Sequence, residues 1–424
     1  MGRLDPHRNV FYYYGSGTRE NNTTKALINV LEHCKREKVL KKFLELLGIA
    51  FEGDLGDVKF EMQKRTIGYE AISKVSQRVL LGISPKGAYE GFETSETDAE
   101  EKEPEAERFS IPDAWIWCDD FVILFENKVL SELDADQMRR HKKKLLIEEE
   151  EREDNAVEER VFSWPRMYNF FSGLISSMGG KDVFILEQFC DYLKVLDLGK
   201  FAGFRPEHFN AFIEDDQELR IQARRALEML LIETREALPA RLKQKLPEYS
   251  IGRVEPDHVW GSLAVAADRH KRGNMPHFTV NLHSNLARIF FNIERKKPMK
   301  KLCDKVKAKK EEFLQLFKKI ARTGYDESLD YILPEYEWEI FERVHHRVNI
   351  YKSAIMFDIN ADYVDKDVID LVIRKIEAKD YLIEFHIAKI FKRHEVIAKK
   401  EKFKEEVVKT ILELEPFYDF AIEK

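Results

Sequence analysis

Phe121-Val122-Ile123-Leu124-Phe125-Glu126-Asn127-Lys128-Val129 is a nearly continuous apolar run that ends in two charged residues, Glu126 and Lys128. An uninterrupted apolar run is typical of a strand that is covered on both faces of its sheet. Side chains two positions apart in a strand point to the same face, so Glu126 and Lys128 are expected to lie side by side. Burying a carboxylate and an ammonium costs free energy unless each has a partner. The stretch therefore predicts a polar site inside a sheet.

A second carboxylate precedes this strand. Asp113 follows Pro112 on a predicted strand at 109–118, which Asp119-Asp120 joins to the strand at 121–129 as a hairpin turn. Two converging carboxylates suit a hard divalent cation such as Mg²⁺ or Mn²⁺, and the cation would offset their mutual repulsion. A neighbouring lysine would orient the attacking water and balance charge on a phosphate.

These residues resemble the signature of the PD-(D/E)XK nuclease superfamily: Ile111-Pro112-Asp113 matches its first element and Glu126-Asn127-Lys128 its second. The resemblance covers about residues 1–200. It implies that Asp113, Glu126 and Lys128 are catalytic. It also implies that the two acids and the main-chain carbonyl of Asn127 hold the metal.

The order of predicted elements agrees with this resemblance. The family core runs helix, three strands, helix, strand, and the sequence shows periodicities in that order, with a short helical stretch before Ser84. We therefore expect an α/β restriction-endonuclease-like core within a chain that is α+β overall. The expected core elements are a helix at 22–47, strands at 58–63, 109–118 and 121–129, a helix from 133 to about 150, and a strand at 159–163.

Two further positions resemble features of some superfamily members. Glu20, before the first helix, resembles an acidic residue near the metal, and Gln137 opens a Gln-x-x-x-His stretch similar to a Gln-x-x-x-Tyr motif. Here His141 stands in place of the tyrosine. The resemblance implies that Glu20 is a metal ligand and Gln137 is catalytic. The alternatives are a favourable charge at a helix N-terminus and a solvated helix residue.

Length and periodicity divide the chain into three parts. Residues 1–200 form the nuclease-like domain, with an acidic loop at 89–107. Residues 201–250 form a helical bridge, and 251–424 form an α+β domain of unknown function that binds a substrate or a partner. Beyond the core we expect helices at 165–178, 182–197, 217–246, 300–322, 365–378 and 403–420, and strands at 277–283, 287–294, 351–359 and 381–390.

Basic residues crowd the segment 295–310, which has nine lysines and arginines against one acid, Asp304. Such a run is either a solvated helix face or a phosphate-contacting surface. The candidate nucleic-acid contacts are Lys296, Lys297, Lys300 and Lys301.

Composition restricts the other possibilities. Charged residues make up 35% of the chain but the net charge is only −7, which gives no overall signature of nucleic-acid binding. The four cysteines form no CxxC pair, and the twelve histidines show no metal-ligand spacing, so we interpret Asp257-His258, His283 and His345-His346 as packing or surface residues. No membrane-spanning run or signal peptide is evident, and we expect a cytoplasmic protein.

The bare motif also occurs a second time. Pro256-Asp257 precedes Glu294-Arg295-Lys296, but 37 positions separate these two acids, against 13 between Asp113 and Glu126. The longer spacing does not suit adjacent hairpin strands. For Glu126 and Lys128 themselves the alternative is a structural ion pair on a half-exposed strand.

These patterns predict a metal-dependent nuclease that hydrolyses phosphodiester bonds in DNA, with RNA as the other substrate, in phage defence, restriction or repair. Its partners would be nucleic acid, another copy of the chain or a defence-system protein. The alternative is a catalytically inactive nuclease-fold module that binds nucleic acid or a protein.

Overall fold

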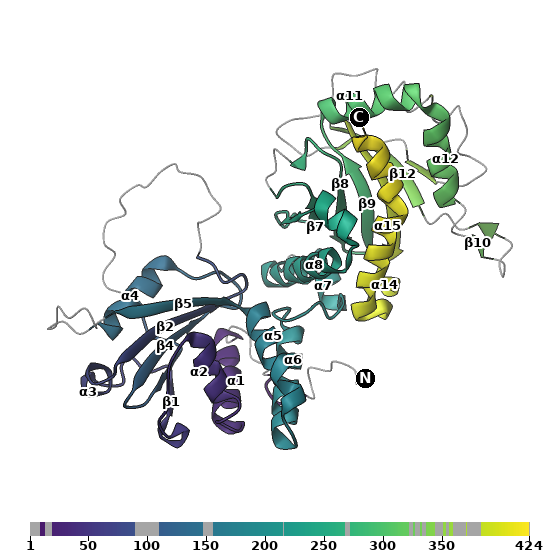
Figure 1. The fold of residues 1–424 in the computed structure, drawn as a ribbon. Coiled ribbons are helices and arrows are strands. Elements are labelled where there is room, and N and C mark those ends of the chain that lie inside the picture. Colours follow the sequence, from purple (N-terminus) through teal and green to yellow (C-terminus); the bar gives the residue numbers. More distant parts are fainter. Residues whose placement is uncertain are drawn as a thin grey trace. The chain divides into compact units, whose positions relative to one another are not determined.

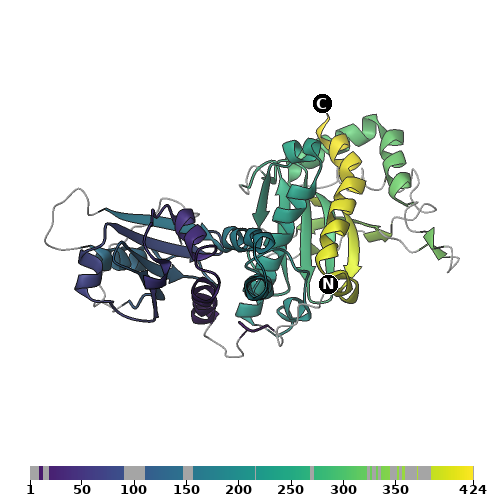
Figure 2. The ribbon, with the colours of Figure 1, turned by 60° about the horizontal axis from the view of Figure 1, so that its bottom comes forward.

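The chain forms two compact units, Met1–Lys200 and Phe201–Lys424, in a computed structural model (Figures 1 and 2). Each unit is built around its own sheet. The structure describes residues 9–12, 19–89, 110–146, 156–214, 216–267, 272–321, 325–326, 331–332, 336–343, 351–352, 356–358, 370 and 383–423.

The first unit contains a five-stranded mixed sheet with the order β1-β3-β4-β2-β5. Strand β2 runs parallel to both of its neighbours, β4 and β5, while β3 is antiparallel to β4 and to β1. The expected β3–β4 hairpin is therefore present. The strands are β1 (Lys59–Met62), β2 (Gln77–Ser84), β3 (Ala114–Trp117), β4 (Phe121–Asn127) and β5 (Val157–Ser163).

Helices cover both faces of this sheet, as Figure 1 shows. One face packs against α1 (Arg19–His33), α2 (Leu40–Leu47), α5 (Trp164–Leu174) and α6 (Lys181–Val195). The other packs against α3 (Tyr69–Ser73) and α4 (Ala135–Leu145). Every residue of β4 is buried, which is what an apolar run in the middle of a sandwiched sheet requires.

Two expected elements of this unit are wrong. The single helix at 22–47 is two helices, because a hydrogen-bonded turn at Lys35 folds the chain back and lets Leu31 of α1 and Phe43 of α2 enter the same core. The helical stretch expected before Ser84 holds only the short helix α3, and its end is the strand β2, whose apolar residues pack on both faces of the sheet. Four strands, not three, therefore precede α4.

The second unit contains an eight-stranded antiparallel sheet with the order β13-β12-β15-β9-β8-β7-β6, to which β14 adds by pairing with β12. Its described strands are β6 (Glu248–Ile251), β7 (His258–Ala264), β8 (His277–His283), β9 (Leu286–Ile293), β12 (Tyr336–Arg343), β13 (Tyr351–Lys352), β14 (Met356–Asp358) and β15 (Ile383–Lys392), with a separate pair β10 (Tyr325–Asp326) and β11 (Tyr331–Ile332).

Alternation along β8 separates the two faces of this sheet. Phe278, Val280 and Leu282 enter the hydrophobic core of the unit, so His277, Thr279, Asn281 and His283 point to the opposite face. The core helices are α7 (Pro206–Asn210), α8 (Gln217–Ala237), α9 (Ala240–Lys245), α11 (Lys296–Ala308), α12 (Lys310–Ala321), α14 (Arg393–Lys399) and α15 (Phe403–Ile422).

Several expected segments lie in this unit. Residues 201–250, interpreted as a helical bridge, supply α7, α8 and α9 and pack in the core of the second unit. The helix expected at 217–246 breaks at Leu238-Pro239, and the one at 300–322 is the pair α11 and α12. The expected hairpin is β8 and β9, and the last expected helix is α15. Most of the acidic loop 89–107, His345-His346 and nearly all of 365–378 lie outside the described residues.

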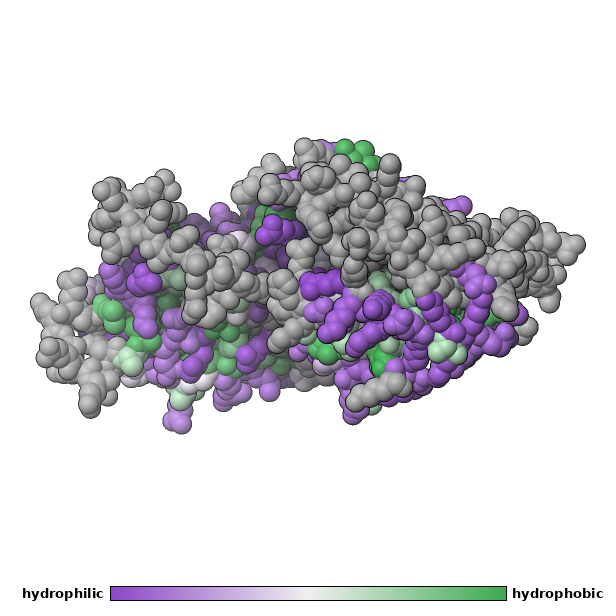
Figure 3. All heavy atoms as spheres, turned by 90° about the horizontal axis from the view of Figure 1, so that it is seen from above, coloured by the Kyte–Doolittle hydropathy of each residue, from purple (hydrophilic) through white to green (hydrophobic). Residues whose placement is uncertain are grey.

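The protein is thus a mixed α/β chain with two sheets. On the face drawn in Figure 3, hydrophilic side chains dominate the coloured surface and apolar ones form small separate patches. All four cysteines are buried and free. Among the described helices, none has the length and apolar character that crossing a membrane requires.

Candidate active site

The β3–β4 hairpin brings Asp113 and Glu126 together. Asp113 directly precedes β3 and its amide donates a hydrogen bond to the Phe125 carbonyl at 3.1 Å, so it lies opposite the end of β4. Its Oδ2 accepts a hydrogen bond from the Asn127 amide at 2.7 Å. The two acids are 8% and 2% exposed, which removes both carboxylates from bulk water.

The Glu126 carboxylate is surrounded by three donors. Lys128 Nζ lies 3.0 Å from Oε1, as the two-residue spacing predicts, and Gln137 Nε2 donates to the same oxygen at 2.6 Å. His141 Nε2 lies 2.9 Å from Oε2. Because Gln137 and His141 are one turn apart, α4 presents both of them to one carboxylate.

Glu20 joins this cluster from α1. Its Oε2 lies 3.6 Å from Lys128 Nζ, and its Oε1 accepts the Val129 amide at 3.3 Å. The side chain of Asn127 points to the opposite face from Glu126 and donates to the Glu20 carbonyl at 2.9 Å and to Thr24 Oγ1 at 3.2 Å. Asn127 therefore fixes the start of α1 against β4.

Further bonds hold the end of β4 in place. The Lys128 amide donates to the Ile83 carbonyl at 2.8 Å, and its own carbonyl accepts a hydrogen bond from Trp164 Nε1 at 3.0 Å. Both main-chain groups of Lys128 are thus satisfied by β2 and α5. The Lys128 ammonium is the group that interacts with the carboxylates of Glu126 and Glu20.

Electrostatics in the cluster reflects its burial. Burial and the nearby Glu126 carboxylate raise the pKa of Asp113 to about 7, although the Asn127 amide and Lys128 act in the opposite direction. Burial lowers the pKa of Lys128, but Glu126, Glu20 and Asp113 outweigh it and raise that pKa above its usual value. Near neutral pH the cluster therefore holds a protonated lysine beside carboxyl groups that repel one another.

Two residues of the cluster were not identified as site residues from the sequence. His141, noted only where the Gln-x-x-x-Tyr pattern fails, is fully buried against Glu126. Gln63 follows β1 with a φ of 52°, and its Nε2 donates to Asp113 Oδ1 at 3.1 Å. Nothing in the sequence marks Gln63, since 50 positions separate it from Asp113.

The carboxylate oxygens of Asp113, Glu126 and Glu20 do not lie as close to one another as the ligands of a bound metal do. Among the described residues, the one group of three His, Cys, Asp or Glu ligand atoms within 4.8 Å of one another is Asp257, His258 and His283 in the second unit. In the first unit both oxygens of Glu126 already have partners. Oxygen donors from Asp113, Glu126 and Glu20 nevertheless match the chemistry that Mg²⁺ prefers.

The second copy of the motif does not form one site. Asp257 pairs with His258 at 2.8 Å beside the end of β8, whereas Glu294 pairs with His277 at 3.4 Å beside its start. A strand of seven residues separates the two acids.

Glu423 partly neutralises the basic segment 295–310. Lys305 and Lys309 both pair with Glu423, at 3.4 and 3.3 Å. Lys297, Lys300 and Lys301 are exposed on α11, and the side chain of Lys296 lies outside the described part of the chain.

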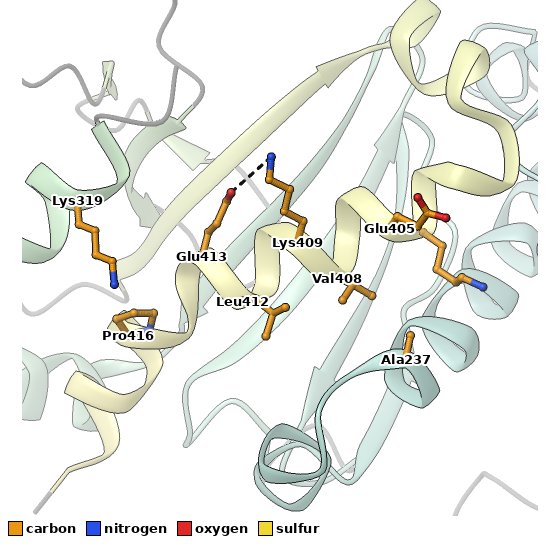
Figure 4. A pocket seen from close by; sticks show the side chains of 9 residues that line it. Ala237, Lys319, Glu405, Val408, Lys409, Leu412, Glu413 and Pro416 are labelled. Carbon is orange, nitrogen blue, oxygen red and sulfur yellow. Dashed lines mark ion pairs between the residues drawn. The ribbon is translucent and has the colours of Figure 1, made fainter. Parts of the chain in front are cut away.

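A hollow in the second unit is lined by α15 residues and by Lys319 of α12 (Figure 4). Two lysines at this hollow are paired, Lys404 with Glu233 at 2.8 Å and Lys409 with Glu413 at 3.8 Å. Their charges are therefore largely balanced.

No protein-family model matches this chain, and no curated protein matches it significantly.

Proposed function

We propose that the first unit is a metal-dependent phosphodiester hydrolase of the PD-(D/E)XK type that cleaves DNA, with RNA as the alternative substrate. The observation that carries the proposal is the buried cluster at the end of β4. There Asp113 and Glu126 converge from the two strands of one hairpin, and Lys128 lies 3.0 Å from Glu126. Buried charges of this kind are costly and are typical of functional sites.

The arrangement of elements supports the same proposal. If α2, the edge strand β1 and the short helix α3 are set aside, the chain runs from α1 through β2, β3 and β4 to α4 and β5. This is helix, three strands, helix, strand, the order of a restriction-endonuclease-like core.

Asp113, Glu126 and Glu20 would hold Mg²⁺ or Mn²⁺. When bound, such an ion makes water a stronger nucleophile and polarises a phosphate oxygen. Burial and the nearby Glu126 carboxylate raise the pKa of Asp113, so a cation between the two acids would relieve their repulsion.

The protein groups then divide the remaining tasks. Lys128 stays protonated and would donate a hydrogen bond to the attacking water or to a phosphate oxygen, balancing the charge that develops as the phosphorus–oxygen bond breaks. Gln137 and His141 hold the Glu126 carboxylate in a fixed orientation from α4.

The test is cleavage of plasmid, linear and single-stranded DNA and of RNA with Mg²⁺ or Mn²⁺. Asp113→Asn and Glu126→Gln are expected to abolish cutting, and Lys128→Gln to reduce it on the order of 100-fold or more. Asp119→Asn, which changes an exposed aspartate in the turn of the same hairpin, is the matched control and should cut normally. Equal cutting by all four variants would refute the proposal.

A second candidate is an inactive nuclease-fold module that binds nucleic acid or a protein. It is favoured by one observation, namely that both oxygens of Glu126 already have partners in the protein. Nucleic-acid binding without turnover, under every metal condition, would support this candidate. A role in phage defence, restriction or repair would be tested by phage challenge of cells that express the wild-type chain or Asp113→Asn.

A further inference from the structure

We propose that Asp257, His258 and His283 form a binding site for a divalent transition-metal ion of the Zn²⁺ type. The site lies in the second unit and is independent of the proposed nuclease centre. One ligand atom from each of the three residues lies within 4.8 Å of the other two.

Strand pairing places the two imidazoles. His258 begins β7 and His283 ends β8, and these residues stand directly opposite each other in the antiparallel register. Their rings stack with centroids 5.1 Å apart and an interplanar angle of 25°. Asp257 precedes His258 and its Oδ1 lies 2.8 Å from His258 Nδ1.

The loop that carries Asp257 is held by several bonds. The Glu255 amide donates to the His258 carbonyl at 2.9 Å, which closes a turn over Pro256-Asp257. From α8, Arg220 donates to the Pro256 carbonyl and Arg224 to the Gly252 carbonyl, both at 3.2 Å. The ligands are therefore arranged in advance on a strand pair and an anchored turn, as a metal site requires.

His283 has an unused ligand atom. Its Nε2 is buried and has no hydrogen-bond partner in the described part of the chain. A buried nitrogen without a partner costs free energy, which a bound ion would recover.

The charges around the two rings are mixed. The His258 ring and Arg288 disfavour a positive charge at His283, whereas the Asp257 carboxylate favours one. Arg288 on β9 opposes a nearby cation, and the Asp257 carboxylate offsets it. These opposing charges favour an ion that binds strongly to imidazole nitrogen.

The donor set selects the class of metal. Two imidazoles and one carboxylate suit Zn²⁺ and its transition-metal neighbours, whereas Mg²⁺ prefers oxygen donors alone. Three protein ligands leave a further coordination position open to water or to another molecule. The exposed side of Asp257 gives that position access to solvent.

Calorimetric titration of Zn²⁺ into the chelator-treated full chain tests the proposal. One Zn²⁺ should bind per chain, and Co²⁺ in its place should give visible absorption bands of a low-coordinate site. His258→Ala and His283→Ala should each weaken this binding by about 100-fold or remove it.

Matched variants keep the test decisive. Asp257→Asn changes an exposed side chain, so it should fold normally and still weaken Zn²⁺ binding. His394→Ala removes an exposed histidine of the same unit and should leave binding unchanged, as should Asp113→Asn in the first unit. Absence of Zn²⁺ binding by the parent chain, or full binding by the folded Asp257→Asn and His258→Ala chains, would overturn the proposal.

Discussion

At the scale of single residues, burying the charged cluster at the end of β4 costs the metal-free protein free energy. Asp113 and Glu126 are nearly inaccessible to water, and Lys128, whose ammonium lies 3.0 Å from Glu126, also lies 3.6 Å from Glu20. Such arrangements are more frequent at functional sites than elsewhere in proteins.

Asp113 predicts a pH dependence of stability. Its folded-state pKa of about 7 lies above its unfolded value of 3.8, so its contribution to stability is fully present below pH 3.8 and is lost as the pH rises through 7. In metal-free buffer at pH 8, Asp113→Asn should therefore be more stable than the parent, by on the order of a few kcal/mol at most.

The difference should disappear near pH 4. Urea unfolding of both proteins at pH 4, 6 and 8 measures it. A difference that stays constant with pH would show that Asp113 is not the titrating group.

Replacing Lys128 is expected to affect cleavage more strongly than stability. Lys128→Gln should reduce cleavage on the order of 100-fold or more, because the developing charge on phosphate loses its cationic partner. Lys143→Gln, an exposed lysine on α4, is the control. Initial rates of Lys128→Gln and Lys143→Gln at saturating Mg²⁺ test this expectation. Equal rates would show that Lys128 takes no part in the mechanism.

The residues of the cluster differ in how far the sequence reveals them. Glu126 and Lys128 are recognisable because two charges interrupt an apolar strand. Gln63 is not recognisable, because its contact with Asp113 depends on a turn with a positive φ after β1. His141 stood out only as a departure from a pattern, although its contact with Glu126 follows from the helical spacing from Gln137.

At the scale of elements, β2 determines how α4 lies on the sheet. Gly82 of β2 is paired with Glu126, and a Cβ at this position would lie 2.6 Å from Leu133 Cδ1 and 2.9 Å from Met138 Cε. The absence of a side chain lets α4 approach closely enough for Gln137 and His141 to reach Glu126.

Gly82→Val should therefore disturb both folding and chemistry. We expect a destabilisation of about 1–3 kcal/mol from overpacking and a fall in cleavage as α4 moves outward. Gly173→Ala on α5 is the control, since nothing lies within 4 Å of its added Cβ. Thermal unfolding and initial rates measure the two effects, and normal behaviour of Gly82→Val would show that α4 does not depend on this contact.

Strand β2 is also the element whose sequence was predicted to be helical. Val79 to Ile83 is a short apolar run, and such runs have no periodicity that separates a buried strand from a buried helix. The hairpin of β3 and β4 was predictable because the turn Asp119-Asp120 and the paired acids mark it. The break between α1 and α2 arises from tertiary packing, which local periodicity does not report.

At the scale of the whole molecule, the two units have separate hydrophobic cores and separate sheets. Each buries large aromatic residues of its own, such as Trp115 in the first and Tyr418 in the second. Units built in this way are expected to fold independently.

A chain ending at Lys200 should therefore fold alone. It should show cooperative thermal unfolding by circular dichroism and retain metal-dependent cleavage, whereas the fragment from Phe201 should retain Zn²⁺ binding and lack cleavage. A fragment 1–200 without cooperative unfolding would mean that the first unit requires the second for its stability.

The place of β2 between β4 and β5 also bears on the chain while a ribosome is making it. The partner of β2 on its outer side, β5, and the indole that fixes the Lys128 carbonyl are translated after every residue of the cluster. A nascent chain that has emerged only as far as His141 thus carries all of the polar groups without the scaffold that aligns them. Under the proposed function, cutting could therefore begin only once β5 and Trp164 have been made, after the rest of the cluster.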